Sequence, residues 1–297
     1  MPASSTSPES GASDPGRSTA LTRLWQILRV VILVWLGVLA FLTLSQQSMI
    51  YYPTKEEASA LQVSAATRGF QPWKNTQGET IGYRNLPASG DQRAPLAVLI
   101  THGNAGYALH RAGYAPILRA AAPDRAVSVY VLEYPGYGAR EGHPSQEGFL
   151  AAADEALARI PAGVPVVILG ESIGTGVASA TAAAHPDRVS GLLLLTPFDS
   201  LANVAQHHYP LLPVRWIMRD QYPSATWLKK YQGPVAVILA ANDSIVPAKF
   251  GQSLFDAYSG PKKLITADQA DHNDLLHTLL PEQWQQALTF LLAPAAR

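Results

Sequence analysis

The chain has 297 residues, enough for one large domain and an additional segment. Its 22 Lys and Arg residues balance 22 Asp and Glu residues, and no basic block is present, which argues against a nucleic-acid partner. The sequence contains no cysteine, which excludes disulfides, thiolate catalysis and cysteine-ligated metals.

The first 46 residues differ in composition from the rest of the chain. Residues 1–20 are rich in Ser, Pro, Gly, Ala and Thr, and we expect a disordered tail there. We expect a transmembrane anchor over residues 21–46, because Leu24–Leu44 is almost entirely apolar and would span about 31 Å as a helix. A cleaved signal peptide is the main alternative, but no small-x-small cleavage site follows cleanly. The absence of a polar face argues against a buried core helix.

The charges around this helix predict its orientation. Arg17, Arg23 and Arg29 precede or open the apolar stretch, whereas only Lys55 closely follows it. Positive residues favour the cytoplasmic side, so we expect the tail in the cytoplasm. The large domain is then expected on the non-cytoplasmic side, which is the periplasm in a Gram-negative bacterium.

After the anchor, from residue 50 to residue 297, strands and helices alternate in a single predicted domain. Following an opening hairpin of Gly69–Trp73 and Thr80–Arg84, apolar runs predict strands at Leu96–Ile100, Val127–Leu132, Val164–Leu169, Gly191–Leu195, Val235–Leu239 and Lys262–Thr266. Helices are expected at Tyr107–Ala121, Ser145–Arg159, Thr175–Ala184 and Pro281–Leu292. This alternation implies right-handed crossovers and a mostly parallel sheet flanked by helices, so the fold class is α/β.

The stretch Gly170–Gly174 places Ser172 between an apolar strand and a helix of small residues. A G-x-S-x-G turn in this setting lifts the serine hydroxyl above the sheet edge, where it can act as a nucleophile. The glycines fit because the turn is strained and the helix passes close to neighbouring strands. A chance Gly/Ser turn would match the same five residues, but the flanking strand and helix favour the nucleophile.

Two acids and two histidines are candidates to assist this serine. Asp243 and Asp199 both follow predicted strands, at the sheet edge where ligands bind in parallel α/β sheets. Asp199 is also placed to cap a helix that begins at the next residue. Of the eight histidines, only His272 and His277 follow Asp243. His277 lies in an apolar stretch that suits packing, whereas His272 lies in a polar loop and is the expected base.

The loop His102–Gly106 follows a strand and opens a helix, so its backbone N–H groups are exposed. The N–H groups of Asn104 and Ile173 are candidates to bind an oxyanion, and a Gly-rich turn with a structural histidine is the alternative. We expect no metal and no cofactor. His207 and His208 are adjacent and point apart, no H-E-x-x-H is present, and no Gly-Lys-Ser/Thr follows a strand.

Together these motifs resemble those of α/β-hydrolases. They are similar to the single-pass membrane group of abhydrolase-domain proteins, which has lysophospholipase-like and acyl-protein-thioesterase-like members. The resemblance runs from about Ile50 to the C-terminus and is carried by His102–Gly106, Tyr134–Gly138, Gly170–Gly174, Asp243 with Val246-Pro247, and Asp271–Asn273. It implies an α/β-hydrolase fold with Ser172 as nucleophile and His272 as base. It favours Asp243 over Asp199 as the orienting acid, and the resulting chain order is that of this fold.

The segment between Phe198 and Pro234, after the sixth strand, has only about 35 residues, so we expect a short cap. Its apolar part contains Tyr209 and Trp216 as candidate substrate contacts, although packing against the sheet and resting on lipid are equally open. The predicted function is a serine hydrolase that cleaves carboxylic esters or thioesters of acyl chains through an acyl-enzyme. A serine peptidase of the same fold and a non-enzymatic anchored interaction protein are the alternatives.

Overall fold

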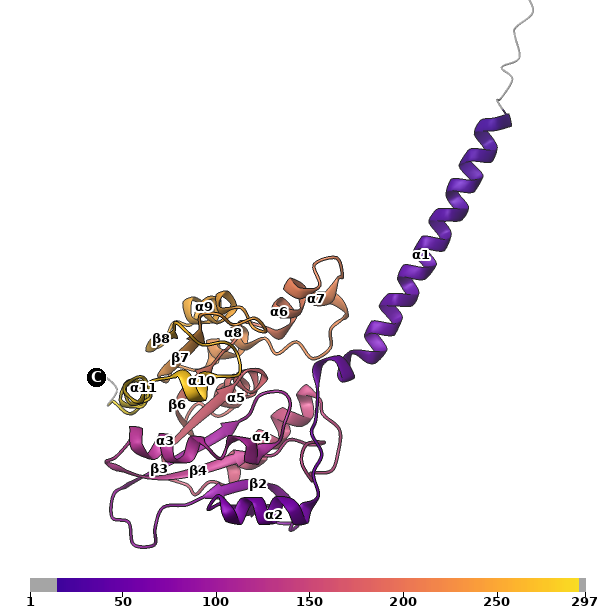
Figure 1. Ribbon diagram of the computed structural model, residues 1–297. Helices are drawn as coiled ribbons and strands as arrows, with labels where there is room; N and C mark the ends of the chain where they lie inside the picture. Colours follow the sequence, from indigo (N-terminus) through magenta and orange to yellow (C-terminus); the bar gives the residue numbers. More distant parts are fainter. Residues whose placement is uncertain (1–14, 294–297) are drawn as a thin grey trace, which may run out of the picture. The chain divides into compact units, whose positions relative to one another are not determined.

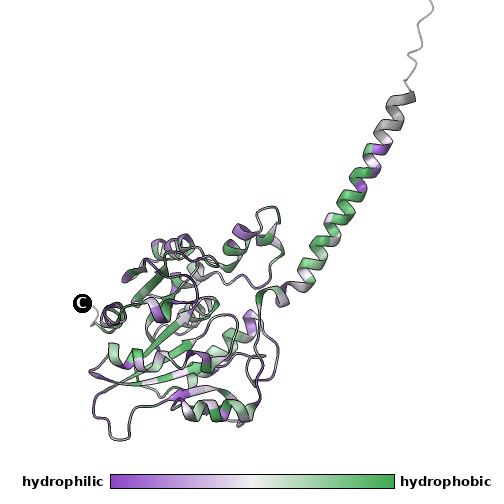
Figure 2. Cartoon of the chain, in the orientation of Figure 1, coloured by the Kyte–Doolittle hydropathy of each residue, from purple (hydrophilic) through white to green (hydrophobic). Residues whose placement is uncertain are grey.

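The computed structural model describes residues 15–293 and divides the chain into two units, residues 1–46 and residues 47–297. Where it is described, the first unit consists of helix α1 (Pro15–Ile50), whose last residues belong to the second unit. Thr22–Ile50 is long and apolar enough to cross a membrane, and apolar residues predominate along it (Figure 2). A signal sequence near an N-terminus can meet the same criteria of length and composition, so these criteria alone do not distinguish the two roles.

The start of α1 differs from the boundary that the composition predicts. Of the disordered tail expected over residues 1–20, residues 1–14 lie outside the described part of the chain, whereas residues 15–20 are helical. Proline is compatible with the first position of a helix because no N–H donor is needed there. Once a long helix exists, each added residue extends it without a new nucleation cost. Local composition is therefore a poor guide to this boundary.

The second unit is built on an eight-stranded sheet (Figure 1). In chain order the strands are β1 (Gln71–Lys74), β2 (Thr80–Asn85), β3 (Ala94–Thr101), β4 (Arg125–Leu132), β5 (Val166–Glu171), β6 (Val189–Leu195), β7 (Val235–Ala240) and β8 (Lys262–Ala267). Their spatial order is β1-β2-β4-β3-β5-β6-β7-β8, with β2 antiparallel to both neighbours and every other pair parallel. The predicted hairpin and mostly parallel sheet are confirmed.

Helices cover both faces of this sheet (Figure 1). They are α2 (Ala58–Thr67), α3 (Tyr114–Ala121), α4 (Gln146–Arg159), α5 (Ile173–Ala184), α6 (Leu201–His208), α7 (Val214–Ile217), α8 (Ser224–Trp227), α9 (Ala248–Ala257), α10 (Leu275–Thr278) and α11 (Pro281–Leu292), with short 3-10 helices η1 (Ala108–Arg111) and η2 (Leu228–Lys230). Successive side chains of a strand point to opposite faces. Leu99 of β3 therefore joins an apolar cluster with α4 and α5, whereas Val98 joins a second cluster with α3 and α11.

The helix predicted over Tyr107–Ala121 is in fact two, η1 and α3. Pro116 explains the break, because proline lacks an N–H group and clashes with the carbonyl four residues earlier. It is tolerated in the first turn of α3, which begins at Tyr114. By contrast, α4 begins as predicted, with Ser145 Oγ accepting the N–H of Gly148 at 3.0 Å.

The segment between β6 and β7 holds α6, α7, α8 and η2 and forms the predicted short cap after the sixth strand. Val214 and Met218 make a small apolar cluster with Ala202, and Ile50 at the end of α1 packs against it. This cap lies next to the carboxyl ends of the parallel strands, where the candidate site residues gather.

Candidate active site

Ser172 occupies a sharp turn between β5 and α5. Its backbone has φ +52°, the left-handed region that is costly for any residue with a side chain. The turn is held by hydrogen bonds from the Ser172 N–H to the Leu195 carbonyl at 3.0 Å and from the Thr175 hydroxyl to the Ser172 carbonyl at 2.6 Å. A Cβ atom at Gly174 would lie 1.9 Å from the Thr101 carbonyl oxygen, so only glycine lets α5 pass this close to β3. The fold therefore fixes the serine hydroxyl above the sheet edge.

The structure brings Ser172, His272 and Asp243 together. His272 Nε2 lies 2.9 Å from Ser172 Oγ, and His272 Nδ1 lies 2.7 Å from Asp243 Oδ2. The side chains of His272 and Asp243 are only 7% and 1% exposed. The second carboxylate oxygen of Asp243 accepts the N–H groups of Ile245 at 2.9 Å and Val246 at 2.6 Å. With the Nδ1 proton held by this fixed carboxylate, Nε2 is left to accept a proton from the serine.

Asp199 and His277, the competing acid and histidine, lie elsewhere. The Asp199 carboxylate accepts the N–H of Ser200 and the side-chain amide of Asn203, both at 2.7 Å. Ser200, not Asp199, is the N-cap of α6, because its Oγ accepts the N–H of Asn203 at 3.1 Å. The packing role expected for His277 is wrong: it is exposed on α10, since only one side of this short helix faces the core.

The two predicted oxyanion donors flank Ser172. Asn104 and Ile173 line the same groove as the serine. Within residues 15–293, neither backbone N–H has an acceptor in the chain. His102, at the start of the loop, is fully buried and lies beside Glu133, with 3.6 Å between His102 Nε2 and Glu133 Oε1. The loop thus presents free donors near the serine and keeps its histidine in the interior.

An apolar groove of about 600 Å³ opens beside Ser172. Its walls include Val204, Tyr209 and Met218 from the cap and Ile245 from the loop after β7. Tyr209 therefore lies where the sequence places a substrate contact. Trp216, the second predicted contact, does not line the groove. It is 90% exposed, because α7 directs this side chain to the outer surface of the cap.

A smaller pocket of about 230 Å³ is lined in part by His272. Its polar centre is an ion pair between Glu171 and Arg111, with Arg111 Nη2 2.5 Å and Arg111 Nε 3.1 Å from the two carboxylate oxygens. The Tyr114 hydroxyl donates to the same carboxylate at 3.1 Å. Burial favours a raised pKa for Glu171, but attraction to Arg111 and its hydrogen bonds outweigh burial and lower that pKa below its usual range. No sequence motif marks Arg111 or Tyr114, and the only signal for Glu171 is that it directly precedes the serine.

The comparisons agree with this architecture. A family model described as alpha/beta hydrolase fold matches residues 97–218. An uncharacterized protein of Mycobacterium tuberculosis, MT2364, is 34% identical over 258 residues, which cover 85% of this chain and 89% of that relative. Lysophosphatidylserine lipase ABHD12 of Danio rerio is 29% identical over 194 residues, which cover 58% of this chain and 50% of ABHD12.

Among solved structures, Est1E from Butyrivibrio proteoclasticus matches with a TM-score of 0.58 at 17% identity, covering 76% of this chain and 100% of Est1E. This likeness shows the fold. The resemblance to α/β-hydrolases inferred from the motifs is confirmed, and the chain belongs to the α/β-hydrolase family.

Proposed function

We propose that this chain is a membrane-anchored serine hydrolase that cleaves carboxylic esters or thioesters of acyl chains. The observation that carries the proposal is the hydrogen-bonded series Ser172–His272–Asp243 at the edge of an apolar groove. A relay of this geometry activates a serine hydroxyl for attack on a carbonyl carbon. The anchor is assigned to residues 21–46 and the catalytic domain to residues 50–297.

The reaction proceeds through an acyl-enzyme. Ser172 Oγ attacks the acyl carbonyl as its proton moves to His272 Nε2, and Asp243 stabilises the imidazolium. The backbone N–H groups of Asn104 and Ile173 bind the oxyanion that forms on the carbonyl oxygen. Collapse of this intermediate releases the alcohol or thiol, which takes the proton from His272. A water molecule, deprotonated by His272, then attacks the acyl-serine and frees the carboxylic acid.

The groove and the anchor support a lipid-derived substrate. The groove walls are mostly aliphatic, and such surface suits an acyl chain better than a peptide. The name of ABHD12 describes a lipase acting on a lysophospholipid, and it points in the same direction. We therefore assign lysophospholipids or acylated surface molecules as the substrate class.

The test is hydrolysis by the full-length chain in lipid nanodiscs, with esters, thioesters and aminoacyl amides as substrates. Wild type is expected to cleave esters or thioesters and to react with a fluorophosphonate probe. Ser172→Ala should lose both properties, with a fall in kcat on the order of a millionfold as in a well-studied serine protease. Ser190→Ala, at an exposed serine of β6, is the matched control and should behave as wild type.

Two outcomes contradict the proposal. Faster cleavage of aminoacyl amides than of any ester would transfer the assignment to a peptidase of the same fold. Failure of the folded wild type to label or to turn over any substrate would favour an anchored interaction protein.

A further inference from the structure

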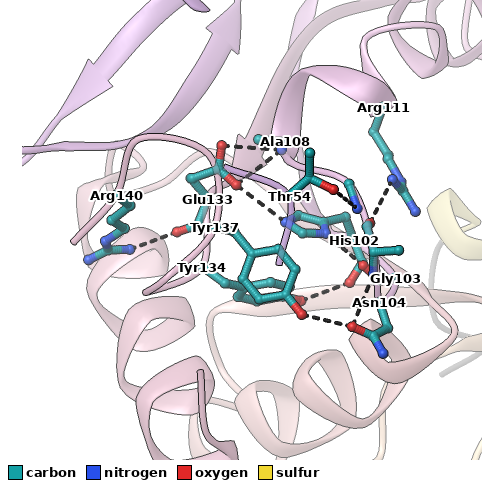
Figure 3. A network of polar contacts seen from close by, with 12 residues as sticks. Thr54, His102, Gly103, Asn104, Ala108, Arg111, Glu133, Tyr134, Tyr137 and Arg140 are labelled. Carbon is teal, nitrogen blue, oxygen red and sulfur yellow. Dashed lines mark hydrogen bonds and ion pairs between the residues drawn. The ribbon is translucent and has the colours of Figure 1, made fainter. Parts of the chain in front are cut away.

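The segment that follows α1 lies along the loop that carries Asn104. We call residues 50–56, which begin at the last residue of α1, the strap. Pro53 forms a parallel bridge with Gly106, and Lys55 forms one with Gly138. Thr54 adds two contacts to the loop: its N–H donates to the Gly106 carbonyl at 3.3 Å, and its Oγ1 accepts the Gly106 N–H at 3.2 Å. Figure 3 shows Thr54 beside this loop.

The side chain of Asn104 connects the strap to the loop. Asn104 Oδ1 accepts the N–H of Tyr52 at 3.0 Å and the hydroxyl of Tyr137 at 2.7 Å. Asn104 Nδ2 donates to the Ile50 carbonyl. Figure 3 shows the Tyr137 hydroxyl pointing at this amide. Both polar atoms of the side chain are therefore used in fixing the loop.

The backbone next to Asn104 is strained. Ala105 has φ +68°, a left-handed conformation that costs free energy for a residue with a side chain. The Ala105 N–H donates to Asn104 Oδ1 at 3.0 Å, so the same amide oxygen that holds the strap also supports the strained residue. Without this support the loop is free to relax, and the peptide that carries the Asn104 N–H would turn with it.

The strap itself is fixed in the domain. The Tyr51 side chain is buried, and its hydroxyl donates to Asp220 Oδ2 at 2.6 Å and lies 2.9 Å from the Tyr222 hydroxyl. Its ring meets Phe149 edge to face, with 5.1 Å between ring centroids. These contacts hold the strap in place. Because the Asn104 side chain is hydrogen-bonded to the strap, the strap can also fix the orientation of the Asn104 backbone.

We propose that the Asn104 side chain is a positioning group, which uses the strap to aim the Asn104 N–H at the oxyanion. The proposal rests on the serine hydrolase function, and it makes the first residues after α1 part of the catalytic machinery. A backbone donor stabilises a transition state only when it is already oriented before charge develops. The Asn104 amide, Tyr137 and Thr54 supply that orientation through contacts that do not involve the substrate.

The experiment compares Asn104→Ala with wild type in full-length chain in nanodiscs, on one chromogenic ester. The variant keeps its backbone N–H but loses every side-chain contact. We expect kcat to fall by about 10- to 100-fold, approaching the loss seen when an oxyanion donor is removed. KM should stay within about threefold, because ground-state binding is retained. Inhibition by a trifluoromethyl ketone, which forms an oxyanion on Ser172, should weaken in parallel with kcat/KM.

Conservative variants separate positioning from folding. Tyr137→Phe and Thr54→Val each remove one contact with little change in shape, and roughly 2- to 10-fold losses in kcat are expected. Asn75→Ala, in the turn between β1 and β2, is the control and should retain wild-type kcat. If Asn104→Ala does not fold, Tyr137→Phe and Thr54→Val decide the question, and wild-type kcat in both overturns the positioning role.

Three further results would overturn the proposal: wild-type kcat in Asn104→Ala, a higher KM at constant kcat, or unchanged affinity for the ketone. Absence of hydrolysis in wild type refutes the proposed function itself. The two failures are therefore distinguishable.

Discussion

Asp243 and Asp199 follow the neighbouring strands β7 and β6, yet their contacts differ. Asp243 holds His272 at 2.7 Å, whereas Asp199 is bound within its own turn. We predict that Asp243→Asn lowers kcat by about 10³- to 10⁴-fold, because an amide favours the wrong imidazole tautomer. Asp199→Asn should change kcat by less than about threefold. Steady-state kinetics on one ester measures both, and the opposite ranking would move the acid to Asp199.

A second prediction concerns the contribution of Glu171 to the stability of the fold. Its pKa is lowered in the folded chain, mainly because attraction and hydrogen bonds from Arg111 outweigh the effect of burial. A lowered pKa stabilises the fold above the ordinary value of 4.5, and this contribution is lost as the pH falls through the folded-state value. Glu171→Gln should therefore destabilise the chain at pH 7 by about 2 kcal/mol, and by less at pH 3.

Chemical unfolding of the detergent-solubilised chain at both pH values tests this ion pair. Asp154→Asn, at an exposed carboxylate that contacts His185, provides a control for the loss of a surface acid. The free energy of unfolding of Glu171→Gln is compared with that of wild type at each pH. If the two differ by the same amount at pH 7 and at pH 3, the charge of Glu171 does not stabilise the fold.

The residues of the relay were predictable one by one because each follows a strand that the sequence predicts. Strands at β5 and β7 are marked by continuous apolar runs, and the chain order leaves few candidates for acid and base. The contacts of Asn104 were not predictable in this way. They join residues far apart in the sequence, such as Ile50 and Tyr137, and no local pattern marks such pairs.

At the level of elements, the sequence predicts the direction of side chains less reliably in the cap than in the strands. The apolar stretch that contains Tyr209 and Trp216 predicts contact with something apolar, but not which side chain faces inward. The very short helix α7 directs Trp216 outward while Tyr209 lines the groove. Without a periodic pattern over several turns, a four-residue helix carries too little information to assign its faces.

The apolar lining of the groove leads to a prediction about acyl-chain length. Each buried methylene contributes about 0.8 kcal/mol, so kcat/KM is expected to rise by about fourfold per methylene from acetyl to medium chains. Ala205→Leu narrows the groove at α6 and should reduce cleavage of the longer esters while sparing acetyl esters. Trp216→Ala should leave the profile in detergent solution unchanged. A chain-length series of p-nitrophenyl esters provides the measurement, and a flat profile would contradict an acyl-binding groove.

At the scale of the whole molecule, the last residues of α1 contribute to the wall of the groove. Met49 and Ile50 line the groove and belong to the second unit. In the sequence, the groove lining therefore begins five residues after Leu44, the last residue of the predicted hydrocarbon span. The proposed anchor and the proposed acyl-binding groove are thus neighbours in the sequence, separated by residues 45–48.

The orientation of the chain in the membrane is the last prediction. Arg17, Arg23 and Arg29 precede or open the apolar span and only Lys55 closely follows it, so the catalytic domain is expected on the non-cytoplasmic face. The absence of cysteine makes this measurable, because a single introduced cysteine is the sole target for a maleimide. In intact cells, an impermeant maleimide should label S190C, at the exposed residue of β6, and should label S5C only after permeabilisation. The reverse pattern would place the catalytic domain in the cytoplasm, and release of the full-length chain by alkaline carbonate would refute an anchor of either orientation.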